Sequence, residues 1–207
     1  MPSLLTHLAL GALLAAALLS DHYDWRSLLI VLAVVAFPDL DTILGLWFEG
    51  AHRAFLHNIW VIVIPAVILA WDLHVREESF VLDRWGARGV RIAWVSMVAL
   101  AFAHILLDAF FNGVNLFWPL HDTFYNLNGR LLYSAEQGLV QTFIELDEPE
   151  LMTVGTTEEV HFRTGVDPGD HPVREFHLIN SGELLIVTVA GFFAAGYRLY
   201  AVHWLDR

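Results

Sequence analysis

The sequence predicts an all-α integral membrane protein, a bundle of about five transmembrane helices with a small extramembrane insert of mixed or β character. Hydrophobic residues make up 57% of the 207 residues, and the mean hydropathy is +0.54. Soluble domains contain only about 45–50% apolar residues. Several apolar runs reach or approach the roughly 20 residues that a helix needs to cross a bilayer.

Five apolar runs are the expected membrane helices. The second run begins near Asp24 or Trp25 and is expected to stop at Pro38, because the residue before a proline is disfavoured in the α conformation. Ser181 is placed as an N-cap of the fifth. No Lys or Arg precedes the first run, which argues against a signal peptide. In chain order the runs are Leu4–Leu19, Leu28–Phe37, Ala54–Trp71, Ile92–Phe111 and Leu184–Tyr200.

The positions of the arginines predict how the protein is oriented in the membrane. The segment Arg76–Arg91 contains four Arg residues and is expected to be a loop between the third and fourth helices. Short basic loops stay cytoplasmic. Alternation then leaves the N-terminus, the Glu49–Arg53 loop and residues 113–181 on the extracytoplasmic face of the cell membrane.

The chain divides into three predicted parts. Residues 1–120 form a four-helix membrane core that carries the candidate metal site, and residues 182–207 contain the fifth helix. Residues 121–181 form an acidic extramembrane insert, with short β-prone stretches at Val140–Leu146 and Val160–Thr164.

Charge and composition exclude some functions. The formal net charge is −12 and Lys is absent, which argues against a nucleic-acid partner. Cysteine is absent too, so any metal must be held by nitrogen and oxygen atoms. An acidic, Lys-free composition is typical of salt-loving archaeal proteins, whose carboxylates are strongly screened.

Polar residues interrupt the apolar runs near the ends of the first four helices. Up-and-down threading through a bilayer puts these four ends on one side, so their imidazoles and carboxylates should gather. The candidates are His7, Asp39, Asp41, His52, His57, His104 and Asp108.

Two of these motifs have an alternative interpretation. His104 and Asp108 are four residues apart, so they share a helix face and can chelate one ion, or they can form a hydrogen bond that only locks the helix. Asp39 and Asp41 follow Pro38 at alternate positions. Either can cap the next helix, but capping needs only one acid.

The remaining histidines differ in how well their positions suit metal binding. His52 and His57 are five residues apart, about 140° on a regular helix, so either a helix starts between them or only one ligates. His57 is the better candidate. His7 gains its value from its neighbours, and His121 is close enough to the fourth helix to be considered. No role is assigned to His22, His74, His161, His171, His177 or His203.

As an ordered set, these residues resemble the membrane-bound metal-dependent hydrolases of the YdjM-like family. The resemblance extends from residue 1 to about residue 120, and Asn58 stands where the family more often has Ser. The family is remotely similar to the zinc phospholipase C and single-strand nuclease group, which implies phosphoester hydrolysis. The motifs are His7, Pro38–Asp41, His52-Arg53 with His57, His104–Asp108 and Trp118-Pro119.

The donor set and the resemblance together predict the chemistry. Several imidazoles with carboxylates suit Zn²⁺, or Mn²⁺ or another divalent transition metal, which can activate water at neutral pH. Asp39 or Asp41 is a ligand or general base, and Arg53 stabilises an anionic transition state. Asn112 and Asn115 orient a membrane lipid or lipid-linked substrate.

Three other interpretations stay open. Ionisable residues in membrane helices also mark transporters and proton-conducting proteins, whose sites lie near the bilayer midplane. A bis-His haem protein needs a facing pair, which only His57 and His104 offer. The bundle can also be purely structural.

Overall fold

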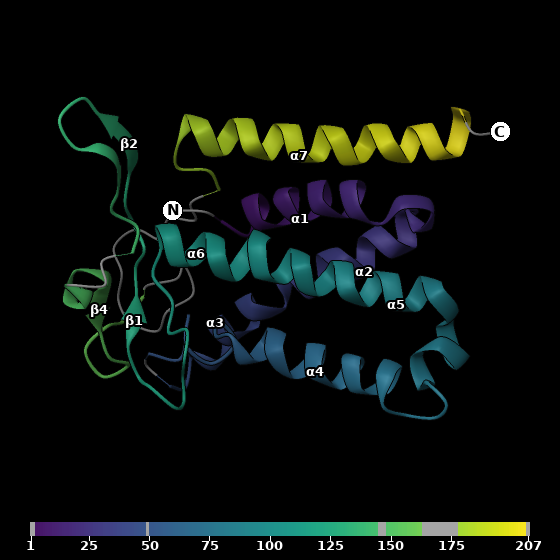
Figure 1. Ribbon diagram of the computed structural model, residues 1–207, viewed down its shortest axis with the longest axis horizontal. Coiled ribbons are helices and arrows are strands. Elements are labelled where there is room, and N and C mark those ends of the chain that lie inside the picture. Colours follow the sequence, from purple (N-terminus) through teal and green to yellow (C-terminus); the bar gives the residue numbers. More distant parts are fainter. Residues whose placement is uncertain (1–2, 49, 145–147, 163–177, 206–207) are drawn as a thin grey trace. The chain divides into compact units, whose positions relative to one another are not determined.

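The computed structural model describes residues 3–48, 50–144, 148–162 and 178–205, and within them the chain is mostly helical (Figure 1). The chain divides into two compact units. We call residues 2–37, 60–104 and 178–207 the helical unit, and residues 38–59 and 105–177 the mixed unit. Each is described separately.

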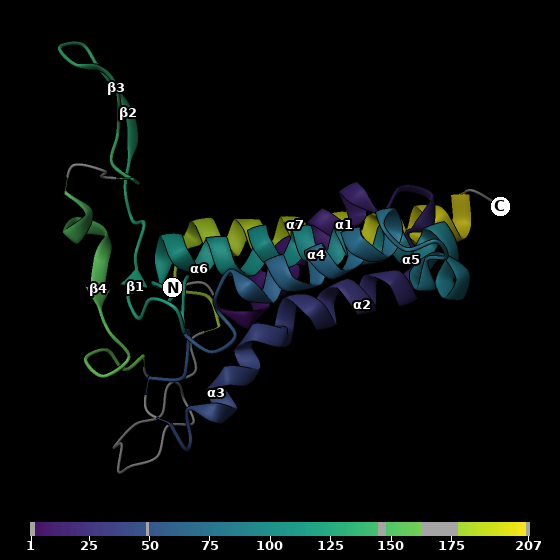
Figure 2. The same ribbon diagram turned by 60° about the horizontal axis from the view of Figure 1, so that its bottom comes forward.

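Five helices that lie side by side make up most of the helical unit (Figure 2). Helix α1 packs against α2, α5 and α7, and α5 also packs against α2 and α4. Short 3₁₀ or π turns adjoin several of these helices in the chain. The helices are α1 (Leu4–Leu18), α2 (Trp25–Ala36), α4 (Trp60–His74), α5 (Phe80–Leu100) and α7 (Gly182–Tyr200).

Three helices within the described residues are long and apolar enough to cross a membrane: Trp25–Leu44, Phe80–Phe111 and Gly182–Trp204. Two shorter apolar helices, Leu4–Leu18 and Trp60–His74, accompany them. The predicted class, a mostly helical membrane protein, is therefore confirmed.

Small residues let the helices of this unit approach closely. A Cβ atom added at Gly191 of α7 would lie 2.3 Å from the carbonyl oxygen of Ala9 in α1. Nearby, the Thr188 hydroxyl donates to the Thr6 hydroxyl across the same pair of helices. Small residues at helix contacts are common in membrane bundles because they permit close backbone packing.

Two predicted helix starts are confirmed by their capping bonds. Asp24 precedes α2, and its carboxylate accepts a hydrogen bond from the Ser27 N–H at 2.8 Å. Ser181 precedes α7, and its hydroxyl accepts from the Leu184 N–H at 3.2 Å.

The predicted stop at Pro38 is correct for the α-helix itself, since α2 ends at Ala36, but the helical path goes on beyond it. The chain continues as a 3₁₀ turn, Phe37–Leu40, and then as the short helix α3, Asp41–Leu44. A tighter turn accommodates the missing proline N–H without ending the helical path. Asp39 therefore lies in a 3₁₀ turn and Asp41 in the first turn of α3.

The predicted bounds of the third and fourth helices also need correction. Helix α4 begins at Trp60 instead of Ala54, because backbone N–H groups before it bond to the Asp41 carboxylate rather than to a helical ladder. Helix α5 begins at Phe80, so most of the predicted Arg76–Arg91 loop is helical. The Ser79 hydroxyl caps it, and Gly86 interrupts it with φ 65°.

Helix α5 continues through a π turn, Ala101–Ile105, into α6, Leu106–Phe111. A π turn holds one more residue than an α turn, and such turns are frequent at functional sites. His104 lies in this turn and Asp108 in α6.

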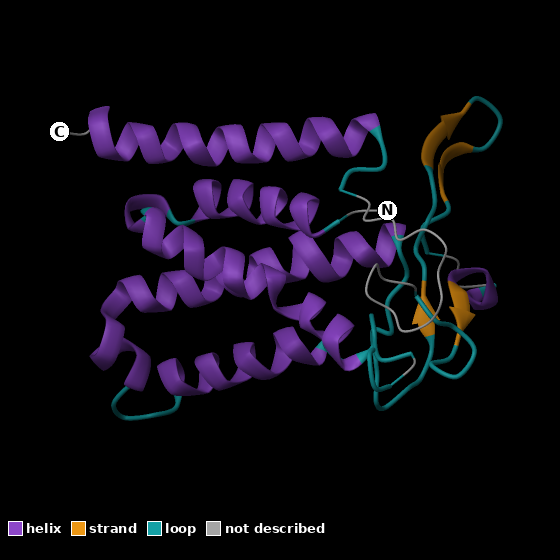
Figure 3. Cartoon of the chain, turned by 180° about the vertical axis from the view of Figure 1, so that it is seen from behind, coloured by secondary structure: helices purple, strands orange, loops and turns teal. Residues whose placement is uncertain are grey.

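The mixed unit contains α3, α6 and two small antiparallel sheets, whose strands are orange in Figure 3. Strand β1 (Phe124–Tyr125) pairs with β4 (Thr153–Gly155). Strands β2 (Leu131–Ser134) and β3 (Gly138–Gln141) form a hairpin. A 3₁₀ turn, Pro149–Met152, precedes β4.

The two β-prone stretches have different outcomes. Part of Val140–Leu146 belongs to β3, and residues 145–147 lie outside the described residues. Residues 160–162 form no strand, since the Val160 N–H bonds back to the Thr156 carbonyl in a turn. The rest of Val160–Thr164 lies outside the described residues.

Candidate metal centre

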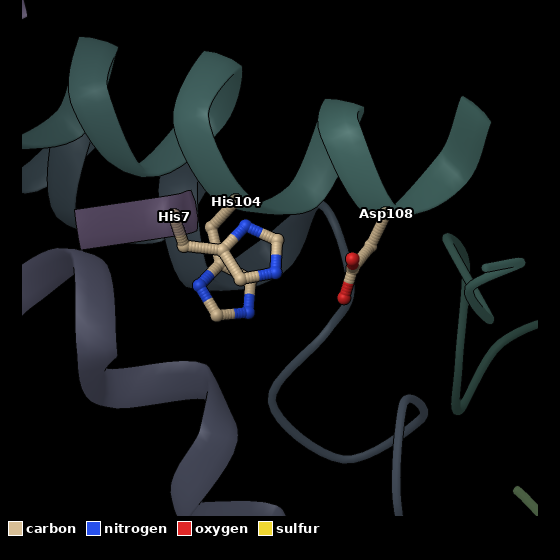
Figure 4. A group of neighbouring side chains, drawn as sticks. All are labelled: His7, His104 and Asp108. Atoms are coloured by element: carbon tan, nitrogen blue, oxygen red, sulfur yellow. The ribbon is translucent and has the colours of Figure 1, made fainter. Parts of the chain in front are cut away.

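Two buried imidazoles lie together in the helical unit (Figure 4). The rings of His7 and His104 stack with centroids 4.0 Å apart and an angle of 14° between their planes. Nδ1 of His7 donates to the Ala103 carbonyl at 2.7 Å, and Nδ1 of His104 donates to the Val35 carbonyl at 2.7 Å. A carbonyl can only accept, so each ring carries its proton on Nδ1 and presents Nε2 as the ligand atom.

Asp108 continues the same helix one turn after His104 (Figure 4). Since the π turn that contains His104 runs directly into α6, the helix sets the spacing of the two residues. His7, His104 and Asp108 are all buried and offer ligand atoms within 4.8 Å of one another, so the group could hold a metal ion.

Asp41 organises the candidate residues of the mixed unit. Its Oδ1 accepts a hydrogen bond from Nδ1 of His52 at 2.8 Å, and its Oδ2 accepts one from Nδ1 of His57 at 2.8 Å. The Arg53 backbone N–H also donates to Oδ2, at 3.0 Å. Both oxygens of this fully buried carboxylate are therefore used to orient neighbouring groups.

His57 faces two further carboxylates through its other nitrogen. Nε2 lies 3.5 Å from Oδ2 of Asp108 and 3.8 Å from Oδ1 of Asp39. Burial lowers the pKa of His57, but the carboxylates of Asp108 and Asp41 outweigh it and raise the pKa to about 9. The surrounding carboxylates thus favour the protonated, positively charged form of the His57 imidazole.

Arg53 is one of two arginines among the described residues of the mixed unit, and it is buried. Its Nη1 donates to the Asn112 carbonyl at 3.1 Å, and its own carbonyl accepts from the Asn115 N–H at 2.9 Å. Burial lowers the pKa of Arg53, while the charges of Asp108, Asp39 and Asp41 oppose this effect. The guanidinium stays protonated at any ordinary pH.

The donor set fits a divalent transition metal. His7, His57 and His104 each have Nδ1 fixed by an oxygen acceptor, which is how metal-binding histidines are usually oriented. Three carboxylates and one guanidinium leave two negative charges when the imidazoles are neutral. Nitrogen and carboxylate oxygen together suit Zn²⁺ or Mn²⁺.

The other predicted residues take different places. His52 contacts Asp41 and the Thr42 hydroxyl, Asn112 donates to the Asp108 carboxylate, and Asn115 is fully buried. His121 is exposed and lies near the Tyr125 ring. His161 is exposed as well, and His171 and His177 lie outside the described residues. His22, His74 and His203 lie at or beyond the opposite ends of their helices from the His7–His104 end.

Sequence reasoning missed a supporting network around Asn115. Nδ2 of Asn115 donates to Oδ1 of Asp122 at 2.6 Å, and the Thr157 hydroxyl donates to Oδ2 of Asp122 at 2.6 Å. Asp122 follows Pro119 closely, but no spacing signal connects it with Thr157. The acceptors for His7 and His104 are backbone carbonyls, which have no sequence signature.

Buried imidazoles and carboxylates at the ends of membrane-length apolar helices define an integral membrane protein with a candidate metal centre. The profile of the YdjM inner membrane protein family matches residues 1–204. The chain therefore belongs to this family, which is described as a family of membrane-bound metal-dependent hydrolases. The match also covers the segment after residue 120, where the motif resemblance ended. Comparisons with curated proteins and with solved structures give no match.

Proposed function

We propose that this protein is a metal-dependent hydrolase that acts on a phosphoester or lipid-linked substrate. The ligands come from His7, His104 and Asp108, together with His57, whose Nε2 lies 3.5 Å from Oδ2 of Asp108. One observation carries the proposal: in each of three buried histidines, Nδ1 is hydrogen-bonded to an oxygen atom, which fixes the orientation of the ring. We propose Zn²⁺, with Mn²⁺ or another divalent transition metal as the replacement.

The carboxylates have separate roles in this proposal. Asp41 is fully buried with both oxygens occupied, so it positions His52 and His57 rather than the substrate. The side chain of Asp39 is 29% exposed, so water can reach it. Asp39 is thus the better general base, which takes the proton of the attacking water and passes it to the leaving oxygen as the scissile bond breaks.

A bound divalent ion would lower the pKa of its water to about 7 and polarise the scissile group. Arg53 stabilises the charge that develops on the substrate oxygens, and Asn112 and Asn115 hold Arg53 in place through backbone bonds.

The arginines support an extracytoplasmic site in a five-span protein. At one end of the helical unit Arg88 bonds to the Asp24 carboxylate at 2.6 Å, Arg91 to the Leu18 carbonyl at 2.7 Å and Arg198 to the Ser20 carbonyl at 2.8 Å. The His7–His104 pair lies at the opposite ends of α1 and α5. By the positive-inside rule the arginine end is cytoplasmic. Residues 121–181 then form the extramembrane insert between the core and the fifth span.

An apolar surface beside the candidate ligands supports a lipid-linked substrate. Leu40, Ile43, Trp47 and Phe48 are all exposed, and they follow or flank Asp39 and Asp41 in the chain. Exposed aromatic residues at this position suit the membrane interface, where a lipid headgroup is within reach of polar residues.

Metal analysis of the detergent-purified protein tests the proposal. We expect stoichiometric Zn or Mn in the wild type, the same content in the control His203→Ala, and its loss in His104→Ala and Asp41→Ala. Metal-free wild-type protein after gentle purification would overturn the proposal. A Soret band in the absorption spectrum would instead indicate haem. Hydrolysis is then assayed on a panel of phosphoesters, lipids and acyl substrates.

A further inference from the structure

We propose that Arg53 forms an oxyanion subsite that holds a phosphate group of the substrate. This inference rests on the proposed function for its setting beside the metal ligands. It deepens that function by selecting a phosphoester over a neutral acyl substrate.

The first observation is a buried cation with an unused donor. Only 7% of Arg53 is exposed, and its Nε–H is buried with no hydrogen-bond partner among the described residues. A buried donor without a partner costs about 1–3 kcal/mol, and more for a charged group. Such a donor is stable in a folded protein when a ligand completes its bonding.

The second observation is the strained backbone that presents this side chain. Arg53 has φ 64°, in the left-handed region that non-glycine residues rarely adopt. Its N–H is bound to the Asp41 carboxylate and its carbonyl to the Asn115 N–H. Bonds on both sides therefore force this conformation, and strain of this kind gathers at ligand sites.

The third observation is what surrounds the guanidinium. Its Cζ lies 4.5 Å from the centroid of the Phe162 ring, which covers one flat face. Nη1 is held by the Asn112 carbonyl. The face and one nitrogen are thus fixed, and Nε remains to donate in the plane of the group. In-plane donation by a guanidinium is the geometry that binds phosphate oxygens.

Binding of inorganic phosphate tests the subsite. Affinity is measured by thermal shift on the detergent-purified full chain, both metal-loaded and metal-stripped, with acetate as a second anion. We expect phosphate to stabilise the wild type and acetate to do so far less. Arg53→Asn should weaken phosphate binding at least tenfold, since Asn tolerates the left-handed backbone but removes the cation. The control Arg130→Asn, at an exposed position of the mixed unit, should bind like the wild type.

Arg53→Lys separates charge from geometry and is the decisive variant if Arg53→Asn does not fold. It keeps the positive charge without Nε, so we expect an intermediate loss of about three- to tenfold. Full phosphate affinity in either variant, or equal binding of acetate, would overturn the inference.

Metal content keeps the two proposals apart. Wild-type protein that binds metal but no phosphate would overturn the subsite alone. Arg53-dependent phosphate binding by a protein that never binds metal would overturn the hydrolase proposal alone. A short-chain phosphatidic acid serves as a second probe. If it binds more tightly than inorganic phosphate through Arg53, the phosphate belongs to a lipid headgroup, and equal binding indicates a soluble phosphoester; both support the subsite.

Discussion

At the scale of single residues, the Asp41 carboxylate determines how two imidazoles point. His52 and His57 bond to different oxygens of the same group, and the Arg53 N–H shares one of them. These three residues come from a segment without regular helix, where no ladder of backbone bonds would hold them. Their orientation thus depends on one buried side chain.

Asp41→Asn should lower metal affinity about 10- to 100-fold, because an amide has one acceptor oxygen and cannot serve both Nδ1–H donors. Competition with a metal-sensitive dye measures the change. Asp83→Asn, at an exposed position of α5, is the matched control and should keep wild-type affinity. An unchanged affinity in Asp41→Asn would mean that the carboxylate does not orient a ligand.

Asp24 should make stability depend on pH. Burial raises the pKa of Asp24, but the Ser27 N–H and Arg88 outweigh it and lower the pKa below the ordinary value. A lowered pKa stabilises the folded state above the ordinary carboxyl pKa, and this contribution is lost as the pH falls through the folded-state value. Thermal unfolding between pH 6 and pH 3 measures the loss.

Two variants divide the role of Asp24. Asp24→Asn keeps a good N-cap and should remove only the pH-dependent part, whereas Asp24→Ala should cost about a further 1 kcal/mol at every pH. An identical pH profile for the wild type and Asp24→Asn would show that another carboxyl group is responsible.

The sequence singled out residues that the structure does bring close, because helix ends in an up-and-down bundle can meet on only two sides. His7 and His104 meet in the helical unit, and Asp41, His57 and Asp108 meet in the mixed unit. Their roles as ligands remain predictions. The acceptors Val35 and Ala103 and the ring of Phe162 could not be predicted, since a backbone carbonyl is present at every residue and Phe162 is distant in sequence.

At the scale of elements, composition located the helices better than it located their ends. Apolar runs predicted α1, α2 and α7 closely. The starts of α4 and α5 were misplaced because they depend on local bonds: the Asp41 carboxylate keeps N–H groups before Trp60 out of a helix, and Ser79 caps α5 within a polar segment. Hydropathy carries no information about either of these hydrogen bonds.

Packing of α1 against α7 gives a prediction at this scale. Gly191→Ala should destabilise the fold by about 1–3 kcal/mol, because the added Cβ would meet the Ala9 carbonyl. Gly196→Ala on the same helix has nothing within 4 Å and should be neutral or stabilising by up to about 1 kcal/mol. Thermal unfolding in detergent compares the two. Equal effects would show that α1 and α7 are not in close contact.

At the scale of the whole molecule, a bound metal should stabilise the fold. A metal at one hundred times its Kd contributes about 2.7 kcal/mol, which corresponds to a rise in Tm of about 5–10 °C for a chain of this size. A chelator should remove this rise in the wild type and in His203→Ala. It should have no effect on His104→Ala, which lacks a ligand. A chelator effect of equal size in His104→Ala would place the metal elsewhere.

The π turn at Ala101–Ile105 has a consequence for how this sequence can vary in length. It adds one residue between the membrane part of the helix and Asp108. Deleting Phe102 would convert the turn to a regular α turn, and the helix on either side would keep nearly the same rotation because the π turn already accommodates the extra residue. A deletion in the regular α part of this helix has no such allowance and would rotate Asp108 by about 100° around the axis. Ala101–Ile105 is therefore the stretch in which this helix can lose a residue without turning the carboxylate away.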